Sequence, residues 1–403
     1  MISRGTGAFV AQPVTALARL RSGIQSRERA LVRLVREQPP SGPLQFGSSS
    51  APAFDVDTIR AALPENATLL EYFRAGDRFL AVIVSRDTLD IVPLAPAGAI
   101  TPIVRLLQFQ FSKFRLGAPF VAAMVRAGLD ATRSHLAELH SALIAPVRDR
   151  LRSRRLVIVP HEQLHHVPLH ALYDGSRYLC DDFEISYAPS AAVYAGCRAL
   201  PPAAGTGALV LGVPDTRAPQ IEGEARAVAA ALPGAGLFLG EQATQQILRD
   251  KGASSRFIHI GTHGRFRRDN PMFSAIRLGD GYLTLYDLYG MSLPAELITV
   301  SGCSTGMNVV TKGDELLGLV RGLLQSGART LMLTLWDVQD GTSAELVKSF
   351  YRKLQSGMEQ PAALRHAMCK LRDEHPHPFY WAPFFLTGAA SGLPLTVTKR
   401  YEC

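Results

Sequence analysis

Two turns in the middle of the sequence carry a histidine and a cysteine beside glycines. The apolar run 257–260 leads into His263, and the apolar run 297–300 leads into Cys303, 40 residues later (303 minus 263). Short apolar runs that stop at turn residues are typical of buried strands in a parallel sheet, and reactive groups gather beyond the carboxyl ends of such strands. The spacing is about that of one strand-to-strand crossover with an inserted loop. It predicts neighbouring strands that bring an imidazole and a thiol to one cleft.

This pair of side chains suits nucleophilic attack on a carbonyl carbon. A free thiol has a pKa of roughly 8.5, so little thiolate exists at neutral pH, and a nearby imidazole generates or stabilises the nucleophile. The glycines let a substrate approach the backbone, and the amides of Gly264 and Cys303 are candidate donors to an oxyanion. Two interpretations stay open from the residues alone. Either His263 and Cys303 form a catalytic pair, or Cys303 is a buried small side chain and His263 a structural turn residue.

Acidic residues are expected near the same cleft. The predicted strand 330–335, which follows that of the cysteine, is followed by Asp337 and Asp340. An exposed carboxylate at this strand end would select a basic substrate side chain. The alternative for Asp340 is that it caps the helix that begins near residue 342. Asp314 and Glu315 are weaker pocket candidates, because their loop leads directly into the next predicted helix.

A histidine-rich segment offers a metal site as an alternative. Four histidines lie within ten residues: His161, His165, His166 and His170. Spacings of four and five can group imidazoles around a metal, but Pro160 and Pro168 interrupt any helix, and neither a cysteine nor paired carboxylates complete a coordination shell. The glycines at 205 and 207 precede a strand, whereas a phosphate-binding loop follows a strand and opens a helix. The sequence therefore predicts neither a metal nor a cofactor.

The composition limits the remaining classes of protein. With 403 residues, 47% of them apolar and 19% charged, the chain can bury a large core. The net charge of +8 is spread along the chain rather than clustered, which argues against nucleic-acid binding. Five scattered cysteines without C-x-x-C spacing indicate reduced thiols. No apolar leader or uncharged stretch of membrane-spanning length is present, so we expect a soluble, cytoplasmic protein that does not bind membranes.

The elements that would position the cleft alternate through the second half of the chain. Six strands are predicted, at 156–159, 208–212, 257–260, 297–300, 330–335 and 384–387. Helices are predicted between them, at 223–232, 242–251, 316–326, 343–355 and 361–374. Such alternation indicates a doubly wound parallel sheet with helices on both faces.

The first half of the chain is predicted to support this sheet. Residues 1–40 contain an amphipathic helix over 13–38, and 41–53 have the composition of a linker. Residues 54–153 mix short strands, near 67–73, 79–85 and 88–94, with long helices near 100–111 and 120–152. The predicted organisation is therefore a helix (1–40), a linker (41–53), an α+β part (54–153), a catalytic part (154–392) and a tail (393–403).

Ordered motifs connect these residues to a known family. They include Val159-Pro160-His161, Glu222-Gly223-Glu224-Ala225, His263-Gly264-Arg265-Phe266, Cys303-Ser304-Thr305-Gly306, Glu315-Leu316-Leu317-Gly318-Leu319 and Leu335-Trp336-Asp337-Val338-Gln339-Asp340. From about Asp55 to Gly392 the chain resembles a CHAT domain, a caspase-like cysteine peptidase domain related to separase and caspases. The resemblance implies a caspase-like three-layer α/β/α sandwich with a mostly parallel six-stranded sheet, plus an N-terminal α+β subdomain. It also implies that His263 and Cys303 are the catalytic dyad.

The resemblance further implies a function and partners. The expected activity is that of a cysteine endopeptidase, which hydrolyses a polypeptide substrate through an acyl-enzyme without a cofactor. In separase-like relatives an acidic residue near a similar Trp-Asp-Val-x-Asp element receives a basic side chain before the cut bond. Family members commonly follow helical repeats that sense a partner, so either a separate polypeptide is the sensor here or the chain acts alone. The alternatives are a non-catalytic caspase-like scaffold that binds protein partners, and another thiol acyl-transfer enzyme.

Overall fold

The computed structural model describes most of the chain after residue 54. The described residues are 55–116, 118–203, 205–265, 274–302, 309–310 and 316–390, with 22, 23, 26, 27 and 30 near the N-terminus. The chain divides into two units, 1–41 and 42–403, and the second contains every strand of the sheets. The predicted tail at 393–403 and the whole of the predicted linker at 41–53 lie outside the described residues.

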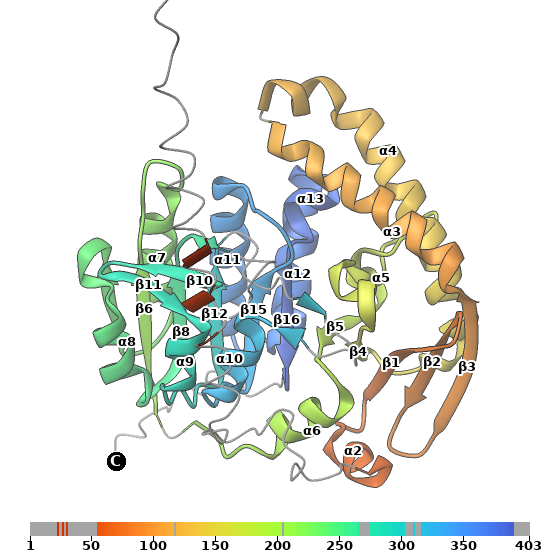
Figure 1. Cartoon of the computed structure of the whole chain (residues 1–403), viewed down its shortest axis with the longest axis horizontal. Coiled ribbons are helices and arrows are strands. Elements are labelled where there is room, and N and C mark those ends of the chain that lie inside the picture. The colour runs from red at the N-terminus through yellow and green to blue at the C-terminus, as the bar shows by residue number, and fades with distance from the viewer. Residues whose placement is uncertain are drawn as a thin grey trace, which may run out of the picture. The chain divides into compact units, whose positions relative to one another are not determined.

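A single large sheet runs through the described chain (Figure 1). Its strands are β1 (Ala67–Ala75), β2 (Arg78–Val84), β3 (Leu89–Pro96), β4 (Arg155–Val159), β5 (Glu184–Tyr187), β6 (Gly207–Gly212), β7 (Ala235–Leu239), β8 (Ser255–Gly261), β12 (Leu297–Ser301), β15 (Thr330–Thr334) and β16 (Phe384–Gly388). Their spatial order is β3-β2-β1-β4-β5-β16-β15-β12-β8-β6-β7. All six strands predicted from the sequence belong to this sheet.

The helices lie between and around these strands. They are α2 (Val56–Ala62), α3 (Ala97–Ser112), α4 (Ala118–Leu143), α5 (Leu179–Asp182), α6 (Ala191–Ala199), α7 (Gln220–Ala231), α8 (Gln245–Gly252), α9 (Leu285–Tyr289), α10 (Leu319–Gln325), α11 (Asp340–Gln355), α12 (Gln360–Glu374) and α13 (Pro378–Trp381). Short strands β9 (Gly264–Arg265), β10 (Ala275–Leu278) and β11 (Gly281–Thr284) form a second sheet, and β13 (Val309–Val310) pairs with β14 (Leu316–Leu317).

Helices cover strand β8 on both faces of the sheet. Its side chains alternate, so Ile258 packs beside Gly252 of α8, while His259 contacts Glu224 of α7 and the ring of Tyr351 of α11. A strand that is buried on both faces must be almost continuously apolar, as this one is. The predicted three-layer α/β/α sandwich is confirmed.

The sheet is larger than the six strands that the sequence predicted. Strands β5 and β7 were missed because β5 has only four residues, two of them polar, and β7 is half-buried along its length. The N-terminal strands extend the same sheet, because β1 pairs with β4 in parallel, with Ala67 opposite Arg155. Figure 1 shows β1, β2 and β3 at the right of this sheet, below the helical hairpin of α3 and α4.

The direction of the strands reverses between β15 and β16, and again on each side of β2. Strand β16 is antiparallel to β15 but parallel to β5. As a result, β6, β8, β12 and β15 all run in one direction, and β1, β4 and β5 run in the other. The carboxyl ends of β6, β8, β12 and β15 therefore meet at one edge of the sheet.

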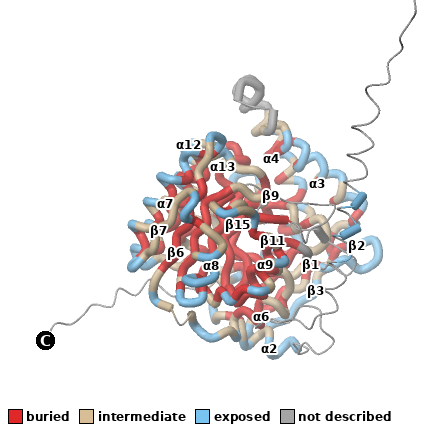
Figure 2. The backbone as a smooth tube through the Cα atoms, turned by 60° about the vertical axis from the view of Figure 1, so that its left-hand side comes forward, coloured by how far each residue is buried: buried red, intermediate tan, exposed pale blue. Residues whose placement is uncertain are grey.

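One apolar core joins the two halves of the described chain. It contains Leu70 and Phe79 of the N-terminal strands together with Ile258 and Leu297 of the central strands, all fully buried. Figure 2 shows the buried residues concentrated along the strands and the exposed ones on loops and outer helix faces. In the described part of the chain, no helix combines the length and apolar character that a membrane span requires.

The shared core predicts a cooperative response to mutation at its N-terminal edge. Leu70→Ala should lower the free energy of unfolding by about 2–5 kcal/mol, because it leaves a cavity in a packed core. Ile91→Ala, on a side chain that is 59% exposed, should change the free energy of unfolding by no more than about 0.5 kcal/mol. Urea unfolding followed by circular dichroism measures both. A separate early transition in Leu70→Ala, with the main transition unmoved, would contradict a single core.

Candidate functional site

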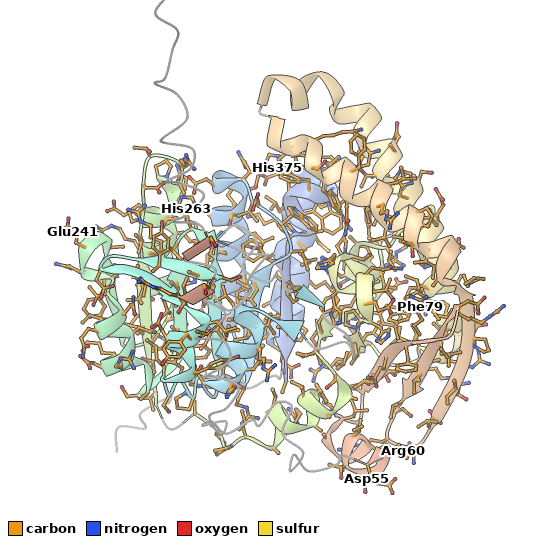
Figure 3. The ribbon with its side chains drawn as sticks, viewed as in Figure 1. Asp55, Arg60, Phe79, Glu241, His263 and His375 are labelled. Carbon is orange, nitrogen blue, oxygen red and sulfur yellow. The ribbon has the colours of Figure 1, made fainter. Side chains whose placement is uncertain are left out.

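A pocket of about 430 Å³ opens where the four parallel strands end. Its described lining comes from the segment between β6 and α7, from the ends of β8, β12 and β15 and the turns after them, and from α7 and α11: Arg217, Ala218, Ile221, Glu224, Thr262, His263, Gly264, Ser301, Gly302, Asp337, Val338, Asp340 and Ser343. Figure 3 labels His263, which lies in this region beside α7 and α11. Cys303, Asp314 and Glu315 lie outside the described residues.

The strands that lead to His263 and Cys303 are direct neighbours. Strand β8 pairs with β12 in parallel, from Phe257 opposite Leu297 to Gly261 opposite Ser301. The amide of Thr262 continues this ladder by donating to the carbonyl of Ser301 over 2.9 Å. Because the pairing continues to the end of both strands, the two turns that follow them leave the sheet side by side.

Gly302 is held tightly between its neighbours. Its Cα lies so close to the turn after β8 that a Cβ atom at this position would collide with the carbonyl oxygen of Thr262. Its own carbonyl accepts a 2.5 Å hydrogen bond from Thr334 Oγ1 at the end of β15. Contacts with β8 and β15 therefore position the residue that is bonded to Cys303, and glycine is required there.

The imidazole of His263 contacts a carboxylate that the sequence patterns did not reveal. His263 Nε2 lies 3.0 Å from Oδ1 of Asp215, which follows β6. A carboxylate only accepts hydrogen bonds, so Nε2 carries the proton in this contact. Asp215 follows the strand predicted at 208–212, so its signal in the sequence is the same as that of His263: a polar residue just beyond the carboxyl end of a buried strand.

Asp215 is ionised in this setting. Burial would raise the pKa of Asp215, but hydrogen bonds from the Arg217 amide and the His263 imidazole outweigh burial and lower the pKa below its ordinary value. Arg277 of β10 adds an ion pair, with Nη1 3.0 Å from Oδ2 of Asp215. The carboxylate is therefore a stable negative charge beside the imidazole.

Asp340 lines the pocket and does not cap its own helix. Gln339 is the cap of α11, since its side chain accepts a hydrogen bond from the amide of Thr342 over 3.1 Å. Asp340 is the first residue of α11 and instead accepts a 2.9 Å hydrogen bond from the amide of Gln220, at the start of α7. The alternative interpretation, in which Asp340 caps this helix, is wrong because the helix begins at Asp340 itself.

The carboxyl group of Asp340 is less easily ionised than an ordinary one. Burial raises the pKa of Asp340, and the negative charge of Glu224 adds to this effect, while the hydrogen bond from Gln220 opposes it. Asp337 is half-buried and lines the same pocket. Both predicted acidic residues that the structure describes thus lie on the pocket wall.

Glu224 forms a buried polar link beneath the pocket. Its side chain is 2% exposed; Oε1 lies 3.0 Å from Nε2 of His259, and Oε2 accepts a 3.2 Å hydrogen bond from Ser301 Oγ. These contacts connect α7 to both β8 and β12 just before their turns. The motif around Glu224 indicates the family resemblance, but the sequence alone does not predict this buried link.

One histidine of the histidine-rich segment, His170, has a structural role. His170 is buried, with Nδ1 2.8 Å from the hydroxyl of Tyr187 and Nε2 3.1 Å from the carbonyl of Ala382. Burial lowers the pKa of His170 to about 4, so it is neutral. Among the described residues, the side chains grouped closely enough to hold a metal ion are the largely exposed Glu345, Glu374 and His375.

The contact of Gly302 with Thr262 predicts a strong effect of one methyl group. Gly302→Ala should destabilise the protein by about 2–4 kcal/mol, because backbone must move to relieve the collision. Gly341→Ala, in the first turn of α11, is the matched control, since the nearest atoms to its new Cβ lie 3.8 Å away, and it should change stability by less than about 1 kcal/mol. Thermal unfolding of both variants measures the difference. Equal stability of the two would show that the turns are not in contact.

Comparisons with known proteins agree with this architecture. The human protein named Tetratricopeptide repeat protein 28 is 26% identical over 324 residues, which cover 63% of this chain and 13% of that protein. A crystal structure of the Saccharomyces cerevisiae separase–securin complex matches 82% of this chain and 30% of the matched chain, with a TM-score of 0.54 and 13% identity. A second structure of that complex matches with a TM-score of 0.53. The chain thus spans less than a third of each of these proteins.

The structural likeness shows the fold, a caspase-like α/β sandwich shared with the separase chain. The family model of the CHAT domain matches residues 133–389, which is more than half of the sequence. The resemblance found in the motifs is therefore confirmed over the α4-to-β16 region. The chain belongs to the CHAT domain family.

Proposed function

We propose that this protein is a cysteine endopeptidase in which Cys303 is the nucleophile and His263 the general acid and base. The observation that carries the proposal is the contact between Gly302 and the backbone of Thr262 at the pocket. Cys303 is bonded to Gly302, and His263 is bonded to Thr262. Consecutive Cα atoms are about 3.8 Å apart. Because Gly302 and Thr262 are in contact, the residues that follow them, Cys303 and His263, are proposed to lie within reach of one bound amide.

In the proposed mechanism, Nδ1 of His263 is the basic atom, because Nε2 donates to Asp215. Nδ1 takes the proton of the Cys303 thiol, and the sulfur attacks the substrate carbonyl carbon to form a C–S bond. The amides of Gly264 and Cys303 stabilise the oxyanion. The C–N bond then breaks, and the leaving amine takes the proton from His263. Water, deprotonated by His263, cleaves the thioester and releases the acid and the free thiol.

The charge of the pocket supports a basic residue before the cut bond. Among the described lining residues, Glu224, Asp337 and Asp340 are acidic and Arg217 is basic, so the lining has a net charge of −2 (three minus one) with histidine neutral. Glu224 is almost fully buried, whereas Asp337 and Asp340 are half-buried, so Asp337 and Asp340 are the proposed contacts of the substrate cation. The volume of about 430 Å³ admits a long side chain.

A polypeptide partner belongs to the same proposal. The separase chain with the similar fold was solved in a complex with securin, and the human relative is named for tetratricopeptide repeats. Since most of that relative lies outside the aligned region, a repeat-containing polypeptide that controls the peptidase is the partner we propose.

The dyad predicts selective labelling by a thiol-reactive peptide electrophile. Cys303 should react with a peptidyl chloromethyl ketone much faster than the other cysteines, and His263→Ala should slow this reaction by about 10²-fold or more, because the thiolate is no longer generated. Cys303→Ala should abolish both labelling and peptide cleavage while leaving the melting temperature unchanged. Mass spectrometry of the labelled peptides gives the site and the rate.

Cys369 is the cysteine that must be controlled in this experiment. A hydrogen bond from the Cys180 thiol, with help from Arg372, lowers the pKa of Cys369 below its ordinary value, and the side chain is half-buried. The reaction should therefore be run in a Cys369→Ser background and compared with iodoacetamide, which has no peptide part. Equal, slow labelling of Cys303 by both reagents, unaffected by His263→Ala, would reject the peptidase in favour of the non-catalytic scaffold.

The acidic residues of the pocket lining, Asp337 and Asp340, predict that their substitution changes substrate specificity while the dyad stays intact. In a peptide-library profile, Asp337→Asn and Asp340→Asn should each weaken the preference for arginine or lysine before the cut by about tenfold, since each removes one negative charge from the pocket. Labelling of Cys303 by a small electrophile should stay within about twofold of wild type, which serves as the internal control. A basic preference that survives in the double variant would show that another residue recognises the substrate.

A further inference from the structure

The carboxylate of Asp215 is surrounded by hydrogen-bond donors. Oδ1 accepts from the amides of Arg217 (2.8 Å) and Ala218 (3.2 Å), and it lies 3.0 Å from Nε2 of His263. Oδ2 accepts from Nη1 of Arg277 over 3.0 Å. The two backbone amides fix the carboxylate within the turn after β6, so its direction does not depend on His263.

Arg277 joins the two partners from a third side. Its amide donates to the carbonyl of His263 over 3.0 Å, and its own carbonyl accepts a 2.5 Å hydrogen bond from Thr262 Oγ1. The same residue therefore binds the backbone of the histidine turn and, through its guanidinium, the side chain of Asp215. Hydrogen bonds among the turn after β6, the turn after β8 and strand β10 therefore hold Asp215 and His263 in place independently of the bond between their side chains.

We propose that Asp215 is a positioning residue for His263, which makes the site a three-residue arrangement of Cys303, His263 and Asp215. This inference rests on the proposed peptidase function. Asp215 holds the imidazole in the form with the proton on Nε2 and keeps Nδ1 available for the thiol. After the thiol proton moves to Nδ1, the carboxylate stabilises the imidazolium and does not itself take a proton.

The surroundings of Asp215 allow orientation and charge to be separated. In Asp215→Asn the side-chain oxygen should stay on the Oδ1 side, because two backbone amides donate there, and the new NH₂ group should face Arg277, which is 43% exposed and can turn away. The acceptor for Nε2 is then kept and only the charge is lost. In Asp215→Ala both the acceptor and the charge are lost.

The first measurement is the tautomer of His263, which does not require a substrate. Histidine-selective ¹⁵N labelling resolves the two ring nitrogens, and His263→Gln assigns the signals among the eleven histidines. Above about pH 8 the wild type and Asp215→Asn should have the proton on Nε2, whereas Asp215→Ala should give a mixture of both tautomers. An unchanged tautomer in Asp215→Ala would overturn the inference.

The second measurement is the rate of Cys303 labelling in the Cys369→Ser background. Asp215→Ala should slow labelling by about 10²-fold or more, and Asp215→Asn by a smaller factor, because it keeps the orientation. With a cleavable peptide the loss should appear in kcat rather than KM. Wild-type rates in both variants would overturn the inference.

Asp280→Ala is the matched control for the loss of an aspartate that accepts backbone hydrogen bonds. Asp280 accepts from the amide of Gln245 at the start of α8 (3.0 Å) and is not among the residues that line the pocket. It should affect thermal stability without changing the tautomer or the labelling rate by more than about twofold. If Asp215→Ala does not fold, Asp215→Asn and Arg277→Met replace it in both measurements. If these two variants each have the labelling rate and the tautomer of the wild type, the inference is overturned.

The two proposals fail in different ways. Absence of cleavage and of selective labelling in the wild type, with a tautomer that still changes in Asp215→Ala, rejects the peptidase and supports the positioning of His263. Normal cleavage that is lost in Cys303→Ala but unaffected in both Asp215 variants supports the peptidase and overturns the role of Asp215.

Discussion

The site depends on a single backbone contact, that of Gly302 with the carbonyl of Thr262. It exists because β8 and β12 are adjacent, parallel and paired in register to their last residues. Parallel pairing aligns chemically equivalent ends of strands, and the turns that come after them emerge at the same edge. Strands β6 and β15 flank this pair on either side, so four successive strands contribute side chains to one pocket. A change of register in any of them would move its turn residue away from the others.

Buried polar groups keep this alignment specific. A sheet held only by apolar side chains tolerates small shifts, because apolar contacts have no direction. Glu224, which is almost fully buried, has one oxygen on His259 of β8 and the other on Ser301 of β12. A shift of either strand by one residue would break the bond to that strand, and an unsatisfied buried carboxylate oxygen is costly. The link lies directly below the pocket, where an error of alignment would matter most.

The sequence was sufficient to predict the central strands and their order along the chain. It was insufficient to predict which distant segments pair with one another. The apolar runs that became β8, β12 and β15 were recognisable because strands buried on both faces leave no polar alternation. The four-residue β5 left no such pattern, and the pairing of β1 with β4 joins residues far apart in the chain. Asp215 was missed for a related reason, since its partner His263 is 48 positions away and only the order of strands brings them together.

Two carboxylates of the same region have opposite pKa shifts, and their partners explain why. Asp215 accepts hydrogen bonds from four donors, which more than offset burial, so its pKa is lowered. Asp340 accepts one backbone hydrogen bond from Gln220 and lies near the charge of Glu224, so its pKa is raised. A carboxylate with several hydrogen-bond donors keeps its charge and its orientation. A carboxylate with few donors is stabilised when a cation binds beside it. The difference fits a proposed division of roles in which Asp215 orients the imidazole and Asp340 awaits a basic substrate side chain.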